Sequence, residues 1–200
     1  MAVVGEARPT SSPAAARITT GALACIARWG MAKTTLDDIA REAGCSRATI
    51  YRLFPGGKQA VLDAAGEVEL ARILDELSGA LDRTDTLADL LVVAISESVR
   101  AIRSHAALQY LIEHEPGAVL AHVSFDELDP LLAVATAFGT PYLVPHVGPA
   151  RAGATAEWVT RLVVSYGIEP CRDLDDPVVA RALVETFILP GLERADLDAA

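Results

Sequence analysis

The chain has 200 residues and a formal net charge of −10, with 52% hydrophobic and 22% charged residues. This hydrophobicity excludes a disordered chain, which lacks the apolar residues that a core needs. The length allows a core to form without metal or disulfide support. The longest unbroken aliphatic run, Leu90–Ile95, is far shorter than the roughly 20 apolar residues of a membrane helix.

Two features of the sequence bear on where the protein works. The residues near the N-terminus contain no apolar segment of the kind found in a signal peptide. Cys25, Cys45 and Cys171 are widely spaced and form no Cys-x-x-Cys pair, which favours free thiols over disulfides or a zinc site. We therefore expect a cytoplasmic protein without bound metal and without membrane association. A redox role for Cys45 stays open.

Positive charge is concentrated near the N-terminus. Residues 1–60 hold eight Lys and Arg against four Asp and Glu, a balance of +4. Residues 61–200 hold nine against 23, a balance of −14. A basic N-terminal part on an acidic body favours contact between that part and a polyanion such as nucleic acid. A chance difference in composition between two domains would give the same asymmetry, so charge alone does not identify a nucleic-acid-binding protein.

The first helical pattern follows a polar N-terminal stretch. Residues 1–13 are rich in serine and proline near their end, which predicts a disordered arm. From about Ala14, apolar residues recur at steps of three and four, which predicts a helix that Gly30 ends. Thr35 is a suitable N-cap for the next helix, with Asp38 at the N3 position of a capping box.

Two short helices then form the pattern of a helix-turn-helix. The second helix ends at Gly44, and Ser46 caps a third that runs to Phe54. Two short helices joined by a tight turn with a central glycine are typical of this motif. Ala40 is small where the helix axes cross, Gly44 can adopt the left-handed turn, and Ile50 fills the crossing. This spacing predicts that the third helix enters the major groove of DNA.

The same residues carry a family resemblance. The stretch from Thr35 to Phe54, TLDDIAREAGCSRATIYRLF, followed by Lys58, resembles the DNA-binding domain of the TetR family of transcriptional regulators. The resemblance implies an all-α fold, in which a three-helix, homeodomain-like helix-turn-helix domain precedes a helical domain for ligand binding and dimerisation. It implies a disordered arm over 1–13, the DNA-binding domain over 14–60 and the regulatory domain over 61–200. Family members are homodimers whose small-molecule ligand changes the spacing of the two DNA-binding domains on an operator.

The resemblance also implies which residues meet DNA. Phosphate contacts are implied at the start of the second helix, at the recognition-helix cap, at its tyrosine position and at the lysine opening the fourth helix: Thr34 or Thr35, Ser46, Tyr51 and Lys58. Base contacts are implied for the exposed start of the recognition helix, with an arginine beside it: Arg47, Ala48, Thr49 and Arg52. Three positions depart from the family pattern. Cys45 stands where valine is usual, Leu53 stands where a polar residue is common, and Pro55–Gly57 adds one residue before Lys58.

Side-chain chemistry fits these roles independently of the resemblance. The Arg47 guanidinium matches the O6 and N7 acceptors of guanine, and the Ala48 methyl group can contact that of thymine. Tyr51, Arg52 and Lys58 are suited to phosphates, which position a protein on DNA without specifying sequence. Alternatives remain for two of these residues. Tyr51 could pack with Phe54 in a small core, and Arg47 could be a solvated surface charge.

The rest of the chain predicts long helices. They are expected over 58–81, 87–103, 105–114, 119–138 with an interruption near Asp129–Pro130, 154–168 and from Pro177 to about Pro190, with Asp175–Asp176 as the cap of the last. Residues 139–153, with three prolines and three glycines, predict a loop. The first of these helices is expected to direct an apolar face inward: Val61, Leu62, Ala65, Val68, Leu70 and Leu74.

The last two helices are apolar on nearly every side, which predicts burial in a subunit interface. The expected interface residues are Trp158, Leu162, Val163, Tyr166, Val179, Leu183 and Phe187. Polar or aromatic residues on the apolar helices of the body are the candidate ligand contacts. These are Tyr110, His114, His122, Phe125, Phe138 and Trp158. The ordinary alternative for each residue in either set is the core of a single chain.

Taken with the TetR resemblance, these patterns predict a dimeric repressor that binds a pseudo-palindromic double-stranded operator and is released by a small, largely apolar effector. No cofactor is expected. An activator, or a DNA-binding protein of the same fold without a ligand, is the alternative. An enzyme is not expected, because the sequence contains no Gly-rich phosphate loop, nucleophile elbow or His-Glu-x-x-His motif.

Overall fold

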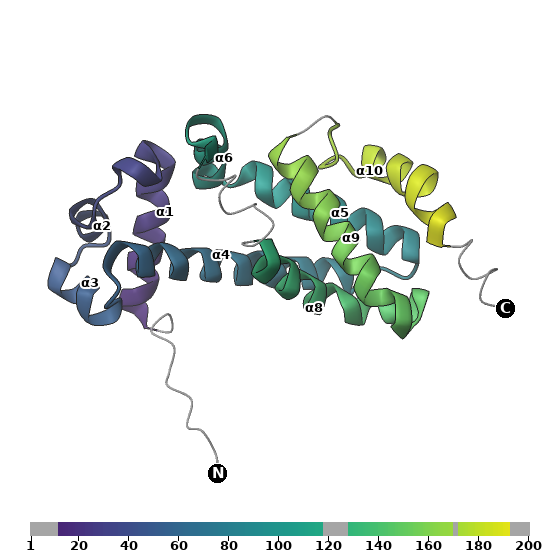
Figure 1. Cartoon of the computed structure of the whole chain (residues 1–200), viewed down its shortest axis with the longest axis horizontal. Helices are drawn as coiled ribbons and strands as arrows, with labels where there is room; N and C mark the ends of the chain where they lie inside the picture. Colours follow the sequence, from purple (N-terminus) through teal and green to yellow (C-terminus); the bar gives the residue numbers. More distant parts are fainter. Residues whose placement is uncertain (1–11, 118–127, 170–171, 193–200) are drawn as a thin grey trace, which may run out of the picture. The chain divides into compact units, whose positions relative to one another are not determined.

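The computed structural model describes residues 12–117, 128–169 and 172–192, with the side chains of 128–131 left out. Every regular element within these ranges is a helix, which confirms the all-α prediction. The described chain forms two compact units (Figure 1). Unit 1 contains the residues up to Arg72 together with Ala106–Pro116, and unit 2 contains Ile73–His105 and the residues from Gly117 onward. The boundary expected between residues 60 and 61 falls inside a continuous helix, α4.

Unit 1 consists of four helices and the first part of α4. Their bounds are α1 Pro13–Lys33, α2 Leu36–Glu42, α3 Arg47–Leu53, α4 Gly57–Leu81 and α6 Ala106–His114. Ser12 caps α1 by accepting a hydrogen bond from the Ala15 N–H at 3.1 Å, and Pro13 occupies the first turn. Gly30, with φ +82°, interrupts α1 as predicted, although a further short turn continues to Lys33. The core of the unit is built by α1, α2, α3 and α4, with Ile18, Ile39, Ile50, Phe54 and Val61 all buried.

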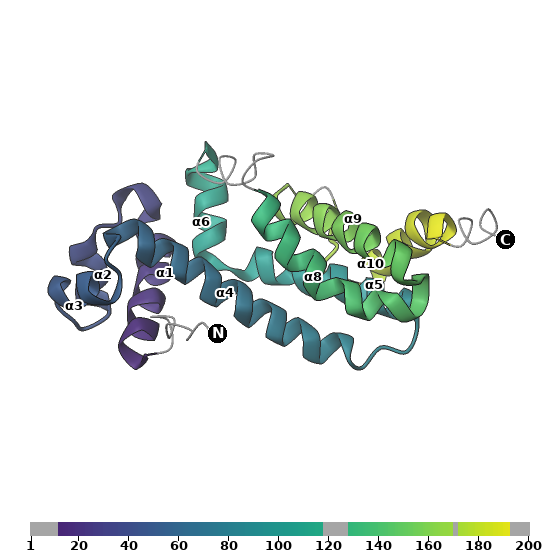
Figure 2. The ribbon, with the colours of Figure 1, turned by 60° about the horizontal axis from the view of Figure 1, so that its bottom comes forward.

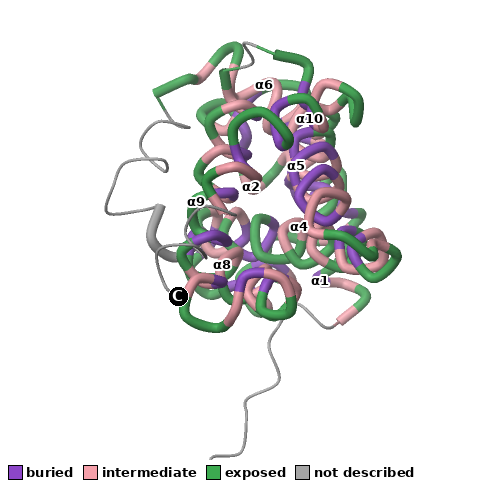
Figure 3. The backbone as a smooth tube through the Cα atoms, turned by 90° about the vertical axis from the view of Figure 1, so that its right-hand side faces the viewer, coloured by how far each residue is buried: buried purple, intermediate pink, exposed green. Residues whose placement is uncertain are grey.

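Unit 2 consists of the second part of α4 and the remaining helices (Figure 2). Their bounds are α5 Leu87–Ser104, α8 Leu128–Val147, α9 Pro149–Ile168 and α10 Pro177–Leu183, followed by a π-helical turn over Val184–Ile188. Buried positions gather along α5, which packs against α9 and α10 (Figure 3). The predicted cap of α10 is confirmed, since the Asp176 carboxylate accepts from the Val178 N–H at 2.8 Å.

Two predictions about these helices were wrong, and part of a third lies outside the described residues. The loop expected over 139–153 is instead the end of α8, a one-residue break at Gly148 with φ +75°, and the start of α9. Each internal proline of α8 removes one backbone donor, but Leu143 and Val147 remain buried in the core of unit 2, and this burial offsets the loss. Residues 119–127, where the next helix was expected to begin, lie outside the described residues, and α8 is helical from Leu128 onward. Val68, expected inside, is exposed on α4.

Arginine side chains connect α5 with α10 and with the segment that precedes α10. Arg103 pairs with Asp175, and Arg100 donates to the Asp175 carbonyl at 3.0 Å. At the other end of α5, Asp89 pairs with Arg181 of α10 at 2.5 Å. These contacts fix where α10 lies in unit 2. No helix in the described ranges combines the length and apolar character needed to cross a membrane.

Candidate nucleic-acid interface

The crossing of α2 and α3 has the geometry that the sequence predicts. Gly44 adopts φ +61°, and the Cys45 N–H donates to the Ala40 carbonyl at 2.9 Å, which closes the turn. Ala40 of α2 is buried at the crossing, and Ile50 of α3 is fully buried. Because a φ near +60° is costly for residues with a Cβ, glycine fits this turn. The turn therefore fixes the direction in which α3 leaves α2.

Both short helices begin with a side-chain cap. Thr35 Oγ1 accepts from the Asp38 N–H at 3.2 Å, while Asp38 Oδ2 accepts from the Thr35 N–H at 3.1 Å. This confirms the predicted capping box, and its hydrogen bonds to Thr35 lower the pKa of the Asp38 carboxyl. Ser46 Oγ accepts from the Thr49 N–H at 3.2 Å and caps α3. The start of α3 is thus held in place before any DNA is bound.

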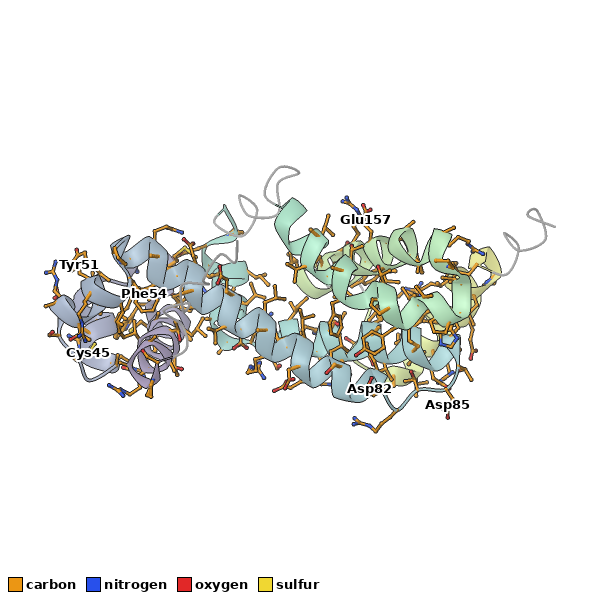
Figure 4. All side chains as sticks on the ribbon, turned by 90° about the horizontal axis from the view of Figure 1, so that it is seen from below. Cys45, Tyr51, Phe54, Asp82, Asp85 and Glu157 are labelled. Atoms are coloured by element: carbon orange, nitrogen blue, oxygen red, sulfur yellow. The ribbon has the colours of Figure 1, made fainter. Side chains whose placement is uncertain are left out.

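The first turns of α3 present their side chains to solvent. Arg47 and Ala48 are exposed, Thr49 is half-buried and Arg52 is exposed. Tyr51 is 46% exposed and lies at the periphery of the unit, whereas Phe54 is 2% exposed and lies inside it (Figure 4). Tyr51 therefore does not pack with Phe54 in the core, which removes the alternative reading of this tyrosine.

The acidic residues of α2 are neutralised by arginines. The pairs are Asp37–Arg47 at 3.4 Å, Asp38–Arg41 at 2.5 Å and Glu42–Arg28 at 2.9 Å. Arg47 also interacts with the Tyr51 hydroxyl, and this hydrogen bond and the Asp37 charge raise the pKa of Arg47. Within the described residues, Lys33 and Arg52 are exposed cations outside any such pair. The surface formed by α2 and α3 therefore carries little uncompensated negative charge.

The structure separates the two candidate threonines. Thr34 is 1% exposed, and its hydroxyl donates to the Gly30 carbonyl at 2.6 Å. Thr35 is exposed at the N-terminus of α2. Of the pair, Thr35 is the residue that is accessible to a phosphate.

Lys58 is engaged inside unit 1. Its Nζ donates to the Met31 carbonyl at 2.7 Å, and the residue is half-buried. The segment Pro55–Gly57, which is one residue longer than in the family pattern, ends at Gly57. This glycine has a positive φ of +67° and begins α4. The lysine that the family resemblance assigns to a phosphate thus contacts the backbone at the end of α1.

Two side chains that contact this region were not singled out from the sequence. Both carboxylate oxygens of Glu115, directly after α6, accept from the Ala32 N–H at 3.3 and 3.2 Å. Arg17 Nε of α1 donates to the Ala43 carbonyl at the end of α2 at 3.4 Å. No sequence signal identifies either contact, because the partner in each case is a backbone group far away in the chain.

The described candidate ligand residues are divided between the two units. Tyr110 and His114 lie on α6 in unit 1, where their rings stack with centroids 4.3 Å apart. Phe138 packs beside Tyr142 against the core of unit 2, and Trp158 is 47% exposed on α9. His122 and Phe125 lie outside the described residues.

The candidate interface residues divide into three groups. Val163 and Leu183 belong to the buried core of unit 2, so they are not part of an exposed face. Leu162, Tyr166 and Val179 are half-buried against that core. Trp158 and Phe187 are exposed, the latter by 67%, and Val178, which the sequence analysis did not name, is exposed by 75%.

Among the residues that the structure describes, no three His, Cys, Asp or Glu side chains gather as a metal site. Cys25 and Cys45 are free thiols, and burial followed by the charge of Glu42 raises the pKa of Cys25. Cys171 lies outside the described residues.

Known proteins resemble both the sequence and the fold. The family described as "Bacterial regulatory proteins, tetR family" matches residues 18–65. An uncharacterized HTH-type transcriptional regulator of Mycobacterium tuberculosis, strain CDC 1551 / Oshkosh, is 31% identical over 158 residues, which are 78% of this chain and 73% of that protein. A protein of the same description from strain H37Rv gives the same values.

Two solved structures share the fold. One is the TetR family repressor AlkX from Dietzia sp. strain DQ12-45-1b, implicated in biodegradation of n-alkanes. It matches with a TM-score of 0.70 at 22% identity, over 94% of this chain and 98% of that chain. The other is the fatty acid degradation regulator FadR from Bacillus halodurans, with a TM-score of 0.60 at 17% identity, over 89% and 97%.

Proposed function

The chain belongs to the tetR family of bacterial regulatory proteins and carries its DNA-binding helix-turn-helix; from this we propose that it is a ligand-responsive repressor that binds a pseudo-palindromic operator as a homodimer. The observation that carries the proposal is the exposed start of α3, which is held by the Gly44 turn and the Ser46 cap. A helix presented in this way fits the major groove of DNA. Such a regulator acts in the cytoplasm.

The side chains of this surface divide into base and phosphate contacts. Arg47, Ala48 and Thr49 lie on the first turn of α3 and read base edges, with Arg47 recognising guanine. Thr35, Ser46, Tyr51 and Arg52 are the residues proposed to contact phosphates and so to position the helix. Removal of a phosphate contact weakens binding to all sequences alike, whereas removal of a base contact relaxes the preference at one position.

Dimerisation is proposed through exposed apolar side chains of α9, of α10 and of the π-helical turn that follows it. Trp158, Val178 and Phe187 are large apolar side chains exposed in a single chain. A second copy related by a two-fold axis would cover them, and the same axis would place two α3 helices on the two half-sites of an operator.

The effector is proposed to act by differential binding. A ligand that prefers the dimer with its DNA-binding units spread apart weakens operator binding by that preference, typically about 1–3 kcal/mol. We propose a largely apolar molecule, because the helices of unit 2 are predominantly apolar. The regulators AlkX and FadR, named for n-alkane and fatty acid degradation, share the fold and support this class of effector.

An activator, or a regulator without an effector, would use the same DNA-binding surface. The position of the operator relative to a promoter separates a repressor from an activator. Retention of full operator affinity in the presence of every apolar compound screened would favour a ligand-independent protein. A catalytic activity is not proposed, since the relatives are transcriptional regulators.

The test is selection of operators from random duplex DNA by the purified full-length chain at two salt concentrations. Enrichment of an inverted repeat with half-sites about one helical turn apart supports a dimeric, sequence-specific regulator. Enrichment of no sequence, with binding that disappears at modest salt, would mean that the basic surface attracts DNA only electrostatically. The proposal would then have to be abandoned.

A further inference from the structure

A single peptide group of unit 1 is held at both of its ends by opposite charges. The carbonyl of Met31 accepts from the Lys58 ammonium at 2.7 Å. The N–H of the same peptide group, which belongs to Ala32, donates to both oxygens of the Glu115 carboxylate at 3.3 and 3.2 Å. The cation meets the negative end of the peptide dipole and the anion meets the positive end, so both contacts are charge-assisted hydrogen bonds.

Gly30, which precedes this peptide group, leaves room for the Glu115 side chain because it has no Cβ. Gly30 has φ +82°, which a residue with a side chain rarely adopts. A Cβ on Gly30 would also lie 2.0 Å from Glu115 Oε1 and 2.8 Å from Tyr110 Cε1. The backbone of α1 and the side chains of α6 therefore meet at a distance that only glycine permits.

The clamped peptide group leads directly into the DNA-facing surface. Two residues beyond it, Thr34 is buried and donates from both its N–H and its hydroxyl to the Gly30 carbonyl, at 3.2 and 2.6 Å. Thr35, which follows, is the cap of α2. The position of Thr35 and of the first turn of α2 is thus set by the backbone that Lys58 and Glu115 hold.

We infer that Lys58 and Glu115 act together as positioning residues of the DNA-binding surface, by clamping the Met31–Ala32 peptide group that places Thr35 and the N-terminus of α2. This inference rests on the proposed function and deepens it. It assigns Lys58 a role through the backbone in place of a direct phosphate contact. It also gives α6 a structural role in DNA binding, because α6 positions Glu115.

The two roles of Lys58 differ in their salt dependence. A lysine that contacts a phosphate releases a counterion, so its loss reduces the slope of log K against log salt by about one per contact. A lysine that holds the backbone lowers affinity without changing the slope. Its effect also depends on Glu115, because the two side chains act on one peptide group.

The experiment is a double-mutant cycle on the full-length dimer with the selected operator, measured at several salt concentrations. The variants are Lys58→Met, Glu115→Ala and the double variant. Glu113→Ala is the matched control, because Glu113 is exposed on α6 and has the same charge. It reports the gain in affinity that follows from removing any carboxylate near DNA.

We expect Lys58→Met to lower operator affinity at least fivefold relative to the wild-type protein, and Glu115→Ala at least fivefold relative to Glu113→Ala, both with an unchanged salt slope. The double variant should lose little more than the weaker-binding single variant. Glu115→Gln, which keeps one acceptor for the Ala32 N–H, should restore part of the affinity. The clamp is refuted if Lys58→Met reduces the salt slope while Glu115→Ala matches Glu113→Ala.

A second measurement judges the clamp without DNA. Amide exchange of Ala32, followed by NMR, should be at least tenfold faster in Glu115→Ala than in Glu113→Ala, with circular dichroism showing both variants folded. Equal exchange rates would overturn the inference. If the wild-type protein selects no operator, the proposed function fails, and this exchange rate still decides whether the clamp exists.

Discussion

Substitution of Arg47 by alanine should reduce operator affinity and relax sequence preference at one base pair of each half-site. The Arg47 guanidinium is exposed, and its pair with Asp37 at 3.4 Å is exposed on both sides. Exposed pairs of this kind contribute little, so Asp37 competes only weakly with a guanine. A lost bidentate contact corresponds to about 5- to 150-fold in affinity. Because both copies in a dimer carry the substitution, we expect a loss of about 30-fold or more.

The assay is fluorescence anisotropy with the selected operator and with an operator altered at the base pair assigned to Arg47. Arg28→Ala is the control, since Arg28 is another exposed arginine of unit 1 and also pairs with an acidic residue of α2, Glu42. Asp37→Asn should raise affinity by less than about fivefold per half-site, the most that an exposed pair can withhold. If Arg47→Ala weakens both operators equally, Arg47 does not recognise a base, and its proposed role is refuted.

Three further outcomes are expected. Val178→Glu should shift the dimer toward monomer at least tenfold in sedimentation analysis, since it places a charge at an exposed apolar residue of α10; unchanged sedimentation would exclude Val178 from the interface. Thr35→Ala removes the cap of α2 and should lower the free energy of unfolding by about 1 kcal/mol in urea titrations, whereas an unaltered midpoint would contradict the capping box. Hydrogen bonds from Thr86 and from Arg181 lower the pKa of Asp89. Its contribution to stability is therefore complete above the ordinary aspartate range and is lost as the pH falls through that range toward the lower folded-state pKa. Asp89→Asn should flatten this acid dependence, and an identical pH profile would refute it.

The helix-turn-helix could be predicted from sequence because its determinants are local. Ala40, Gly44 and Ile50 lie within one short stretch, and each acts on its near neighbours at the crossing of α2 and α3. Thr35 and Ser46 mark the helix starts through bonds to backbone groups three residues away. Local rules of this kind need no knowledge of the rest of the fold.

The end of α8 could not be predicted in the same way. Pro141 and Pro145 are strong local signals for a break, but burial of Leu143 and Val147 in the core of unit 2 keeps this segment helical. Gly148 provides the only interruption between α8 and α9. Whether a segment with prolines remains helical depends on the tertiary contacts of its apolar side chains, and the local sequence pattern does not reveal these contacts.

The clamp on the Met31–Ala32 peptide group was also beyond local reasoning. Glu115 and Ala32 are 83 residues apart, and a backbone N–H has no side chain that marks it as a partner. Tyr110 illustrates the same difficulty, because no local signal in the sequence connects it with Gly30, against which the structure places it.

The interrupted path of the chain through unit 1 limits how such regulators can be recombined. Ala106–Pro116 belongs to unit 1, although α5 and α8, the helices described before and after it, belong to unit 2. A chimera that joins the first 72 residues to the body of another regulator would leave α6 and Glu115 behind. A chimera that exchanges DNA-binding specificity would therefore have to carry both the first 72 residues and the segment Ala106–Pro116. Alternatively, the recipient body would need an α6 that already fits the transferred α1.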